Sequence, residues 1–481
     1  MGATRTIYRN TAFLGAAEII SKGLQFLIML YAARLLSKES FGKFNFALAI
    51  TFIAVILADF GIYTYLVREI SRNRKKEAAS RLFWNSFFVK VFLSLISFLV
   101  IFASLNILGY PEDTKTVVYI MWAFTIILTF TELFYSVFRG FEMMKYDSSN
   151  KIVKMIVLAA ISVYFLSNGF GVFFLAISFV LSELAGLAAA ALIAFRKLIS
   201  FKPEISTKIM ANILKEAIPI GFSNIFGMVY FFIGTVMLSK MKGDSEVAAF
   251  SAAYNIVLAL IFIPTVYTNA IYPVFSRYKK TSEQFRTLYE KSFKYLYMAG
   301  LPISAGIFLL SDRIIYLLYK SSYESSIPIL KIISFFIVLK FLNFLLGTIL
   351  VSLDNQYKRM LGQGLTAVLN IILNLIFIPK YGFIGVAYAT IITEVFLFVV
   401  YYYYVCKNLY FYNFFKILIK PALACIVMAL AMKFMPFGLV LTIILSAMVY
   451  LASITLLKTF DKRDFQLISD IFKNDKLQNN K

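Results

Sequence analysis

The chain of 481 residues contains no histidine, two cysteines and two tryptophans. Without histidine or a paired cysteine motif it has no ligand set for a structural zinc site, so we expect neither a metal nor another cofactor. Cys406 and Cys425 fall at a loop edge and inside an apolar run, and they imply no disulfide framework. The sequence also has no Gly-rich phosphate loop of the Walker type, which argues against direct coupling to ATP.

Charged residues are scarce, at 15% of the chain, whereas hydrophobic residues make up 60%. A soluble domain is nearer to about 25% charged and 45–50% apolar. The apolar residues form continuous runs of roughly 18–26 residues, long enough to cross a bilayer as helices and unlike the alternating strands of a barrel. We therefore predict an all-α polytopic membrane protein with about 14 transmembrane helices. Candidate spans are 11–35, 41–66, 83–108, 117–138, 152–167, 172–195, 217–239, 248–273, 293–318, 327–351, 360–378, 384–405, 417–434 and 438–457.

The net charge of +23 would suggest nucleic acid as the partner of a soluble protein. Here the basic residues lie in loops beside the spans, so topology explains them better and we expect no nucleic-acid partner. One set of alternate loops holds more than three times as many lysines and arginines as the other. This bias predicts a multi-pass protein of the cell (plasma) membrane with both termini in the cytoplasm.

The two halves of the chain resemble each other. Segment 36–50 is answered by 238–256, and Gly169-Phe170 is answered by Gly382-Phe383. Glu183 and Glu394 then fall at matching places in the sixth and twelfth spans. The repeat predicts two parallel six-helix bundles. The expected division is an N-terminal bundle at 1–196, a cytoplasmic linker at 197–216, a C-terminal bundle at 217–405, two extra helices within 406–457 and a cytoplasmic tail at 458–481.

Several segments resemble one known family. Segments 33–44 and 57–62 are similar to its first and second spans, and 272–276 to the end of its eighth span. The most specific match is Asn-Ile-Ile-Leu-Asn-Leu at 370–375, which runs into Ile-Pro-Lys-Tyr-Gly-Phe-Ile-Gly-Val-Ala at 378–387. The chain thus resembles the Wzx-like polysaccharide and oligosaccharide flippases of the MOP exporter superfamily, which also contains lipid II flippases and MATE drug exporters.

The resemblance implies a flippase rather than an enzyme. Its implied substrate is a polyprenyl-diphosphate-linked oligosaccharide, whose lipid tail stays in the bilayer while its polar head cannot cross unaided. Membrane lipids and the enzymes that assemble the glycan would be its partners. Two alternatives remain open: an ion-coupled small-molecule exporter of the MATE type, and a membrane glycosyltransferase or polymerase, which the short outer loops disfavour.

Ionisable residues inside the spans are the default candidates for a transport site. We expect Lys22 and Lys90, with Lys340, to attract the diphosphate. Glu18, Asp59 and Glu132 are the candidates for binding a coupling proton or cation.

Each assignment has a structural alternative. Glu18 and Lys22 are four residues apart and could neutralise each other on one helix face. Lys90 is near the start of its span and could extend to the membrane surface. Asp59 could brace the turn at Gly61, and Glu183 and Glu394 could be structural features of the repeat. Lys154, close to a predicted span end, is interpreted as a topology determinant.

Overall fold

The computed structural model describes residues 2–278, 282–410 and 415–459, which are almost entirely helical and contain no β-strand. Eleven helical segments of this described part are long and apolar enough to cross a membrane. Two of them, Asp244–Ser276 and Gln356–Asn408, each join two consecutive helices. The all-α polytopic class is therefore confirmed, while the count of 14 spans stays a prediction. The predicted tail at 458–481 lies outside the described residues from 460 onward.

The chain forms two compact units. The unit that we call N-terminal comprises Arg9–Asn255 and Gln363–Ala389. The C-terminal unit comprises the described residues of Met1–Tyr8, Ile256–Gly362 and Thr390–Lys481. The domain boundaries expected from the sequence remain a proposal beside this division.

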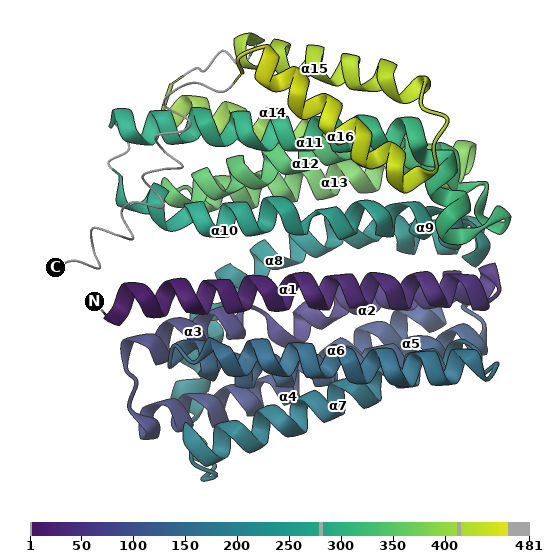
Figure 1. Ribbon diagram of the computed structural model, residues 1–481. Coiled ribbons are helices and arrows are strands. Elements are labelled where there is room, and N and C mark those ends of the chain that lie inside the picture. Colours follow the sequence, from purple (N-terminus) through teal and green to yellow (C-terminus); the bar gives the residue numbers. More distant parts are fainter. Residues whose placement is uncertain (1, 279–281, 411–414, 460–481) are drawn as a thin grey trace. The chain divides into compact units, whose positions relative to one another are not determined.

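The N-terminal unit contains most of α1 (Gly2–Leu35), then α2 (Lys38–Asp59), α3 (Ile62–Arg72), α4 (Lys76–Ile107), α5 (Glu112–Gly140), α6 (Met144–Ser167), α7 (Val172–Lys197) and α8 (Thr207–Lys242). Helix α5 packs against α2, α3 and α7, and α6 packs against α7 (Figure 1). Helix α5 is therefore central to this bundle.

The remaining helices are α9 (Asp244–Leu260), α10 (Phe262–Arg277), α11 (Glu283–Tyr319), α12 (Ser326–Ser352), α13 (Gln356–Tyr381), α14 (Phe383–Asn408), α15 (Phe415–Lys433) and α16 (Leu439–Leu456). Within the C-terminal unit, α11 packs against α12 and α15, and α15 packs against α16. A short 3₁₀ turn, Ser321–Tyr323, connects α11 to α12.

Helix α4 buries its polar residues and exposes its apolar ones. Lys90, Ser94 and Ser97 are buried on one face, whereas Phe92 and Leu99 on the other face are 62% and 61% exposed. A water-soluble helix would bury its apolar face, but in a bilayer the exposed apolar face contacts lipid and the polar face joins its neighbours. The interior of the N-terminal unit is therefore the place where charged side chains gather.

Two predicted spans are interrupted. Span 41–66 is divided into α2 and α3 at Phe60 and Gly61, which have left-handed φ angles of 43° and 87°. Span 248–273 is divided at Ile261 into α9 and α10. Such breaks are tolerated inside a membrane where protein groups satisfy the freed backbone atoms.

Candidate functional site

Asp59 ends α2 and caps α3. Its carboxylate accepts hydrogen bonds from the backbone N–H groups of Gly61, at 3.3 Å, and Tyr63, at 3.4 Å. These N–H groups have no partner within their own helix, because the first turn of any helix leaves its donors unsatisfied. The brace at Gly61 that the sequence suggested is thus present, and it fixes the Asp59 carboxylate inside the bundle.

Lys90 of α4 is completely buried and pairs with Asp59. Its Nζ lies 2.6 Å from Asp59 Oδ1 and donates to the Thr129 carbonyl of α5 at 2.9 Å. The alternative that Lys90 extends to the membrane surface is therefore wrong for this structure. The pair joins α2, α4 and α5 at one point.

Glu132 lies one turn beyond Thr129 on α5 and is partly buried. It interacts electrostatically with Asp59, Lys90, Lys151 and Lys154. Within the part of the chain that the structure describes, no hydrogen bond or ion pair is made to its carboxylate. An unpaired carboxylate inside a bilayer is costly as an anion, and a bound proton or cation removes that cost.

A second buried ion pair links α6 to α7. Lys154 Nζ lies 2.8 Å from Glu183 Oε2, and the two side chains are 6% and 1% exposed. The stem of Lys154 passes over Gly186, where an added Cβ would come within 3.0 Å of it. The sequence placed Lys154 at a span end and so missed this pair. Its spacing from Asp147 and Lys151, seven and three residues, was the available signal, because it puts the three on one helix face.

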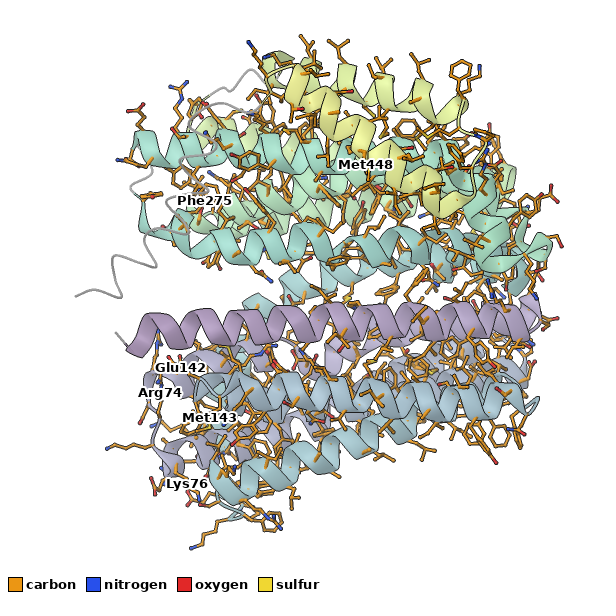
Figure 2. All side chains as sticks on the ribbon, in the orientation of Figure 1. Arg74, Lys76, Glu142, Met143, Phe275 and Met448 are labelled. Atoms are coloured by element: carbon orange, nitrogen blue, oxygen red, sulfur yellow. The ribbon has the colours of Figure 1, made fainter. Side chains whose placement is uncertain are left out.

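The turn between α5 and α6 holds a third charged group. Asp147 is fully buried and lies 2.7 Å from Arg139 Nε and 3.2 Å from Lys151 Nζ. Beside it, Arg74 and Glu142 form an ion pair of 2.5 Å at the same end of the bundle (Figure 2). The positively charged loops of the sequence are thus anchored by specific carboxylates.

The C-terminal unit has its own buried pair. Lys340 of α12 lies 3.3 Å from Glu394 Oε2 of α14, and Asn343 donates to Glu394 Oε1 at 2.8 Å. Both Glu183 and Glu394, which the internal repeat aligned, are therefore held by a lysine from another helix. The lysines differ in origin, since one comes from α6 and the other from α12.

The remaining predicted residues lie on α1. Lys22 is exposed and Glu18 is partly exposed. No ion pair joins the two in the described residues, so Lys22 is not held by its predicted neighbour. The described part of α1 is tied to α6 by a hydrogen bond of 2.7 Å between Tyr31 and Ser167.

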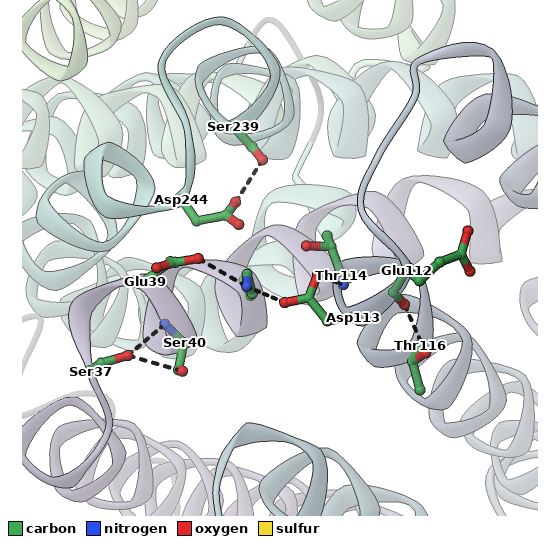
Figure 3. A network of polar contacts seen from close by, with 10 residues as sticks. Ser37, Glu39, Ser40, Glu112, Asp113, Thr114, Thr116, Ser239 and Asp244 are labelled. Carbon is green, nitrogen blue, oxygen red and sulfur yellow. Dashed lines mark hydrogen bonds and ion pairs between the residues drawn. The ribbon is translucent and has the colours of Figure 1, made fainter.

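A polar network closes the opposite end of the N-terminal unit (Figure 3). Lys43 of α2 pairs with Asp113 of α5 and, at 3.0 Å, with Glu39. Next to it, a Cβ added to Gly42 would lie 1.8 Å from the Asp244 carbonyl oxygen. The backbone of α2 and the first residue of α9 therefore touch, and only glycine permits that contact.

The fold and these charge pairs define a class: a multi-pass, all-helical membrane protein that keeps ionisable side chains inside its bundles. A family model described as "Polysaccharide biosynthesis protein" matches residues 7–279, more than half of the chain, and the chain belongs to this family. The MatE model matches residues 219–376. These matches confirm the predicted resemblance to the Wzx-like group of the MOP superfamily.

Curated relatives extend over most of the chain. A probable low-salt glycan biosynthesis flippase, Agl15, of Haloferax volcanii is 24% identical and covers 79% of this chain and 80% of its own length. A putative O-antigen transporter of Escherichia coli K12 is 26% identical and covers 81% of this chain and 94% of its own length.

Solved structures agree on the fold. The lipid II flippase MurJ, in an inward closed conformation, has a TM-score of 0.75 at 16% identity and covers 96% of this chain and 99% of its own. An inward-facing multidrug resistance MATE transporter of the MOP superfamily has a TM-score of 0.66 at 17% identity, with coverage of 81% and 95%. At these identities the likeness establishes the fold alone.

Proposed function

We propose that this protein is a flippase that moves a polyprenyl-diphosphate-linked oligosaccharide from the cytoplasmic to the outer leaflet of the plasma membrane. The observation that carries the proposal is the family match over residues 7–279, supported by relatives named as glycan flippase and O-antigen transporter. No covalent bond changes in such a step, so the protein acts as a transporter and not as an enzyme. The asymmetry of basic residues supports cytoplasmic termini.

The buried charges supply a coupling scheme within this proposal. Glu132, a carboxylate that has no direct partner among the described residues, binds the coupling proton or cation, and Asp59 lies within its electrostatic reach. Lys90 is held by Asp59 in this structure, so a diphosphate must replace that carboxylate to bind it. A proton delivered to Asp59 would release Lys90 for the substrate.

The other predicted residues keep their proposed roles on different grounds. Exposed Lys22 on α1 needs no partner exchange to attract a diphosphate. Lys340 must first leave Glu394 before it can do so. Glu18, partly exposed on the same helix as Lys22, stays a secondary candidate for the coupling ion. Contacts with glycan-assembly enzymes also belong to the proposal.

The test uses purified protein in liposomes with a fluorescent polyprenyl-diphosphate oligosaccharide and an impermeant quencher. Protein-dependent loss of protection, made faster by an ion gradient, is expected. Glu132→Gln should remove the gradient dependence, whereas Glu112→Gln, a matched change on the exposed start of α5, should not. Lys22→Ala should slow flipping severalfold, and unchanged flipping in Lys22→Ala would contradict its site role.

The MATE-type exporter is the competing function, because the MatE model also matches part of the chain. Efflux of a small cationic dye without movement of the lipid-linked oligosaccharide would favour it. A membrane glycosyltransferase has no support in the family match, and the absence of any product in the same vesicles would exclude it.

A further inference from the structure

Helices α5 and α6 carry two adjoining rows of ionisable residues, which we call the charge ladder. Its members recur every three to four residues on each helix and so share one face. They are Glu132, Tyr135 and Arg139 on α5, and Asp147, Lys151 and Lys154 on α6.

Contacts connect the ladder from the turn as far as Tyr135. Asp147 joins Arg139 and Lys151 at 2.7 and 3.2 Å, and Lys151 Nζ lies 5.6 Å from the ring centre of Tyr135. Tyr135 and Lys151 in turn interact electrostatically with Glu132. The ladder therefore leads from the α5–α6 turn to the unpaired carboxylate.

The basic members nearest the turn reach the surface, whereas other members of the ladder are buried. The side chains of Arg139 and Lys151 are 29% and 23% exposed, whereas those of Asp147 and Lys154 are 0% and 6% exposed. The ladder therefore reaches the surface at Arg139, next to the α5–α6 turn and at the end that the basic-residue bias assigns to the cytoplasm.

Several polar atoms beside the ladder point to internal water. The Tyr135 hydroxyl, Ser148 Oγ and Asn150 Oδ1 are buried, and none has a hydrogen-bond partner among the described residues. Buried polar atoms are nearly always satisfied, and ordered water supplies the missing partner where protein does not. Because three such atoms lie on two adjoining helices, a single local packing defect does not explain them.

We propose that the charge ladder is a hydrated proton path that connects the cytoplasmic end of α5 and α6 with Glu132. The inference rests on the proposed function, because it takes Glu132 as the coupling site. Protons move between the oxygens of Asp147, water, Tyr135 and Glu132, with one O–H bond broken at each donor as one forms at the acceptor.

Glu132 is surrounded by charged and titratable groups from every helix packed around it. The groups that act on it or on its neighbours are Asp59 of α2, Tyr63 of α3, Lys90 of α4, Arg139 of its own helix, Lys151 and Lys154 of α6, and Glu183 of α7. Any variant that removes one of the ion-paired members also alters this field. Asp147→Asn, for example, leaves Arg139 and Lys151 without their buried partner and so tests folding rather than proton movement.

Tyr135→Phe is the informative variant, because it deletes only a hydroxyl that makes no hydrogen bond to any described residue. The full-length protein in detergent is subjected to a pH jump, and proton uptake is followed by stopped flow with an indicator dye. The difference in amplitude between the natural protein and Glu132→Gln gives the share taken up by Glu132. We expect Tyr135→Phe to keep that amplitude and to slow the proton uptake assigned to Glu132 at least fivefold.

Tyr319→Phe is the matched control, since it also removes a buried hydroxyl without a described hydrogen-bond partner but lies outside the ladder. It should leave rate and amplitude unchanged. An unaltered rate in Tyr135→Phe would overturn the path while leaving Glu132 as the coupling site. Equal amplitudes in the natural protein and Glu132→Gln would overturn both, and the liposome assay would still decide separately whether the protein flips lipid-linked oligosaccharide.

Discussion

The buried pair between Lys154 and Glu183 gives the sharpest prediction about stability. Its charges are 2.8 Å apart and almost wholly removed from solvent. At an effective dielectric constant of about 20, the mutual attraction is about 6 kcal/mol. The cost of removing both charges from water opposes this attraction, so the pair as a whole contributes far less to stability than the attraction alone.

Breaking one side of the pair should therefore be costly, and replacing both sides should not. Glu183→Gln leaves Lys154 as an unpaired buried cation, and we expect the free energy of unfolding to fall by about 3–5 kcal/mol. Replacing the pair by Lys154→Met together with Glu183→Leu should restore the free energy of unfolding to within about 1 kcal/mol of that of the natural protein. The single variant should also lower the midpoint of thermal unfolding by on the order of 10 °C.

Tryptophan fluorescence is a suitable assay, because both tryptophans of the chain, Trp84 and Trp122, lie in the N-terminal unit with the pair. Unfolding is followed in detergent, with Glu112→Gln as the control for an exposed carboxylate on the same unit. If Glu183→Gln cost less than about 1 kcal/mol, or if the single changes were additive, the interpretation of this pair as a buried charge couple would be refuted.

Two further predictions concern other contacts. Gly42→Ala should destabilise the N-terminal unit by about 1–3 kcal/mol, because its Cβ would lie 1.8 Å from the Asp244 carbonyl oxygen. Gly23→Ala is the control, since a Cβ there has nothing within 4 Å, and it should lower the midpoint of unfolding measured by fluorescence far less. A midpoint shift no larger in Gly42→Ala than in Gly23→Ala would contradict the close contact. Lys340→Met should destabilise the C-terminal unit by about 3 kcal/mol, because it leaves Glu394 without its buried partner. Buried Cys425 should then react with a thiol-reactive dye at a lower temperature. Adding Glu394→Gln to the same chain should reverse most of the loss of stability. Equal dye reactivity in all three proteins would disprove that role of the pair.

The sequence predicted the helical, membrane-spanning architecture well, because hydropathy reports directly on what faces lipid. The span predicted at 172–195 is α7, Val172–Lys197. The span predicted at 152–167 began too late, since Lys145, Asp147 and Lys151 made the first turns of α6 look like a loop. That boundary error is why Lys154 was placed at a span end.

The candidate site was predictable only in part. Charges within spans were visible, and Asp59, Lys90 and Glu132 do lie in one bundle interior. Their pairing was not visible, because whether Lys90 reaches the surface or remains buried depends on Asp59, which approaches from a different helix. Asp147 was missed for the same reason, since its partner Arg139 belongs to the preceding helix.

The break at Phe60 and Gly61 shows how local pattern and tertiary contact combine. The predicted continuous span 41–66 is mostly apolar, and the sequence marks the break through Asp59 and Gly61 rather than through a drop in hydropathy. The left-handed backbone is sustained because Asp59 satisfies the freed N–H groups and Lys90 neutralises Asp59. The chain therefore breaks the helix at this point only in the folded bundle, where the side chains of Asp59 and Lys90 come together.

The most direct test of the central claim is leaflet exchange of a fluorescent polyprenyl-diphosphate oligosaccharide in liposomes that contain the purified protein, with protein-free liposomes as the baseline. An impermeant quencher added outside should reach nearly all of the label when the protein is present, and about half in its absence. A quenched fraction that stays near one half in liposomes containing folded protein, under either direction of ion gradient, would contradict the assignment as a flippase of lipid-linked oligosaccharides.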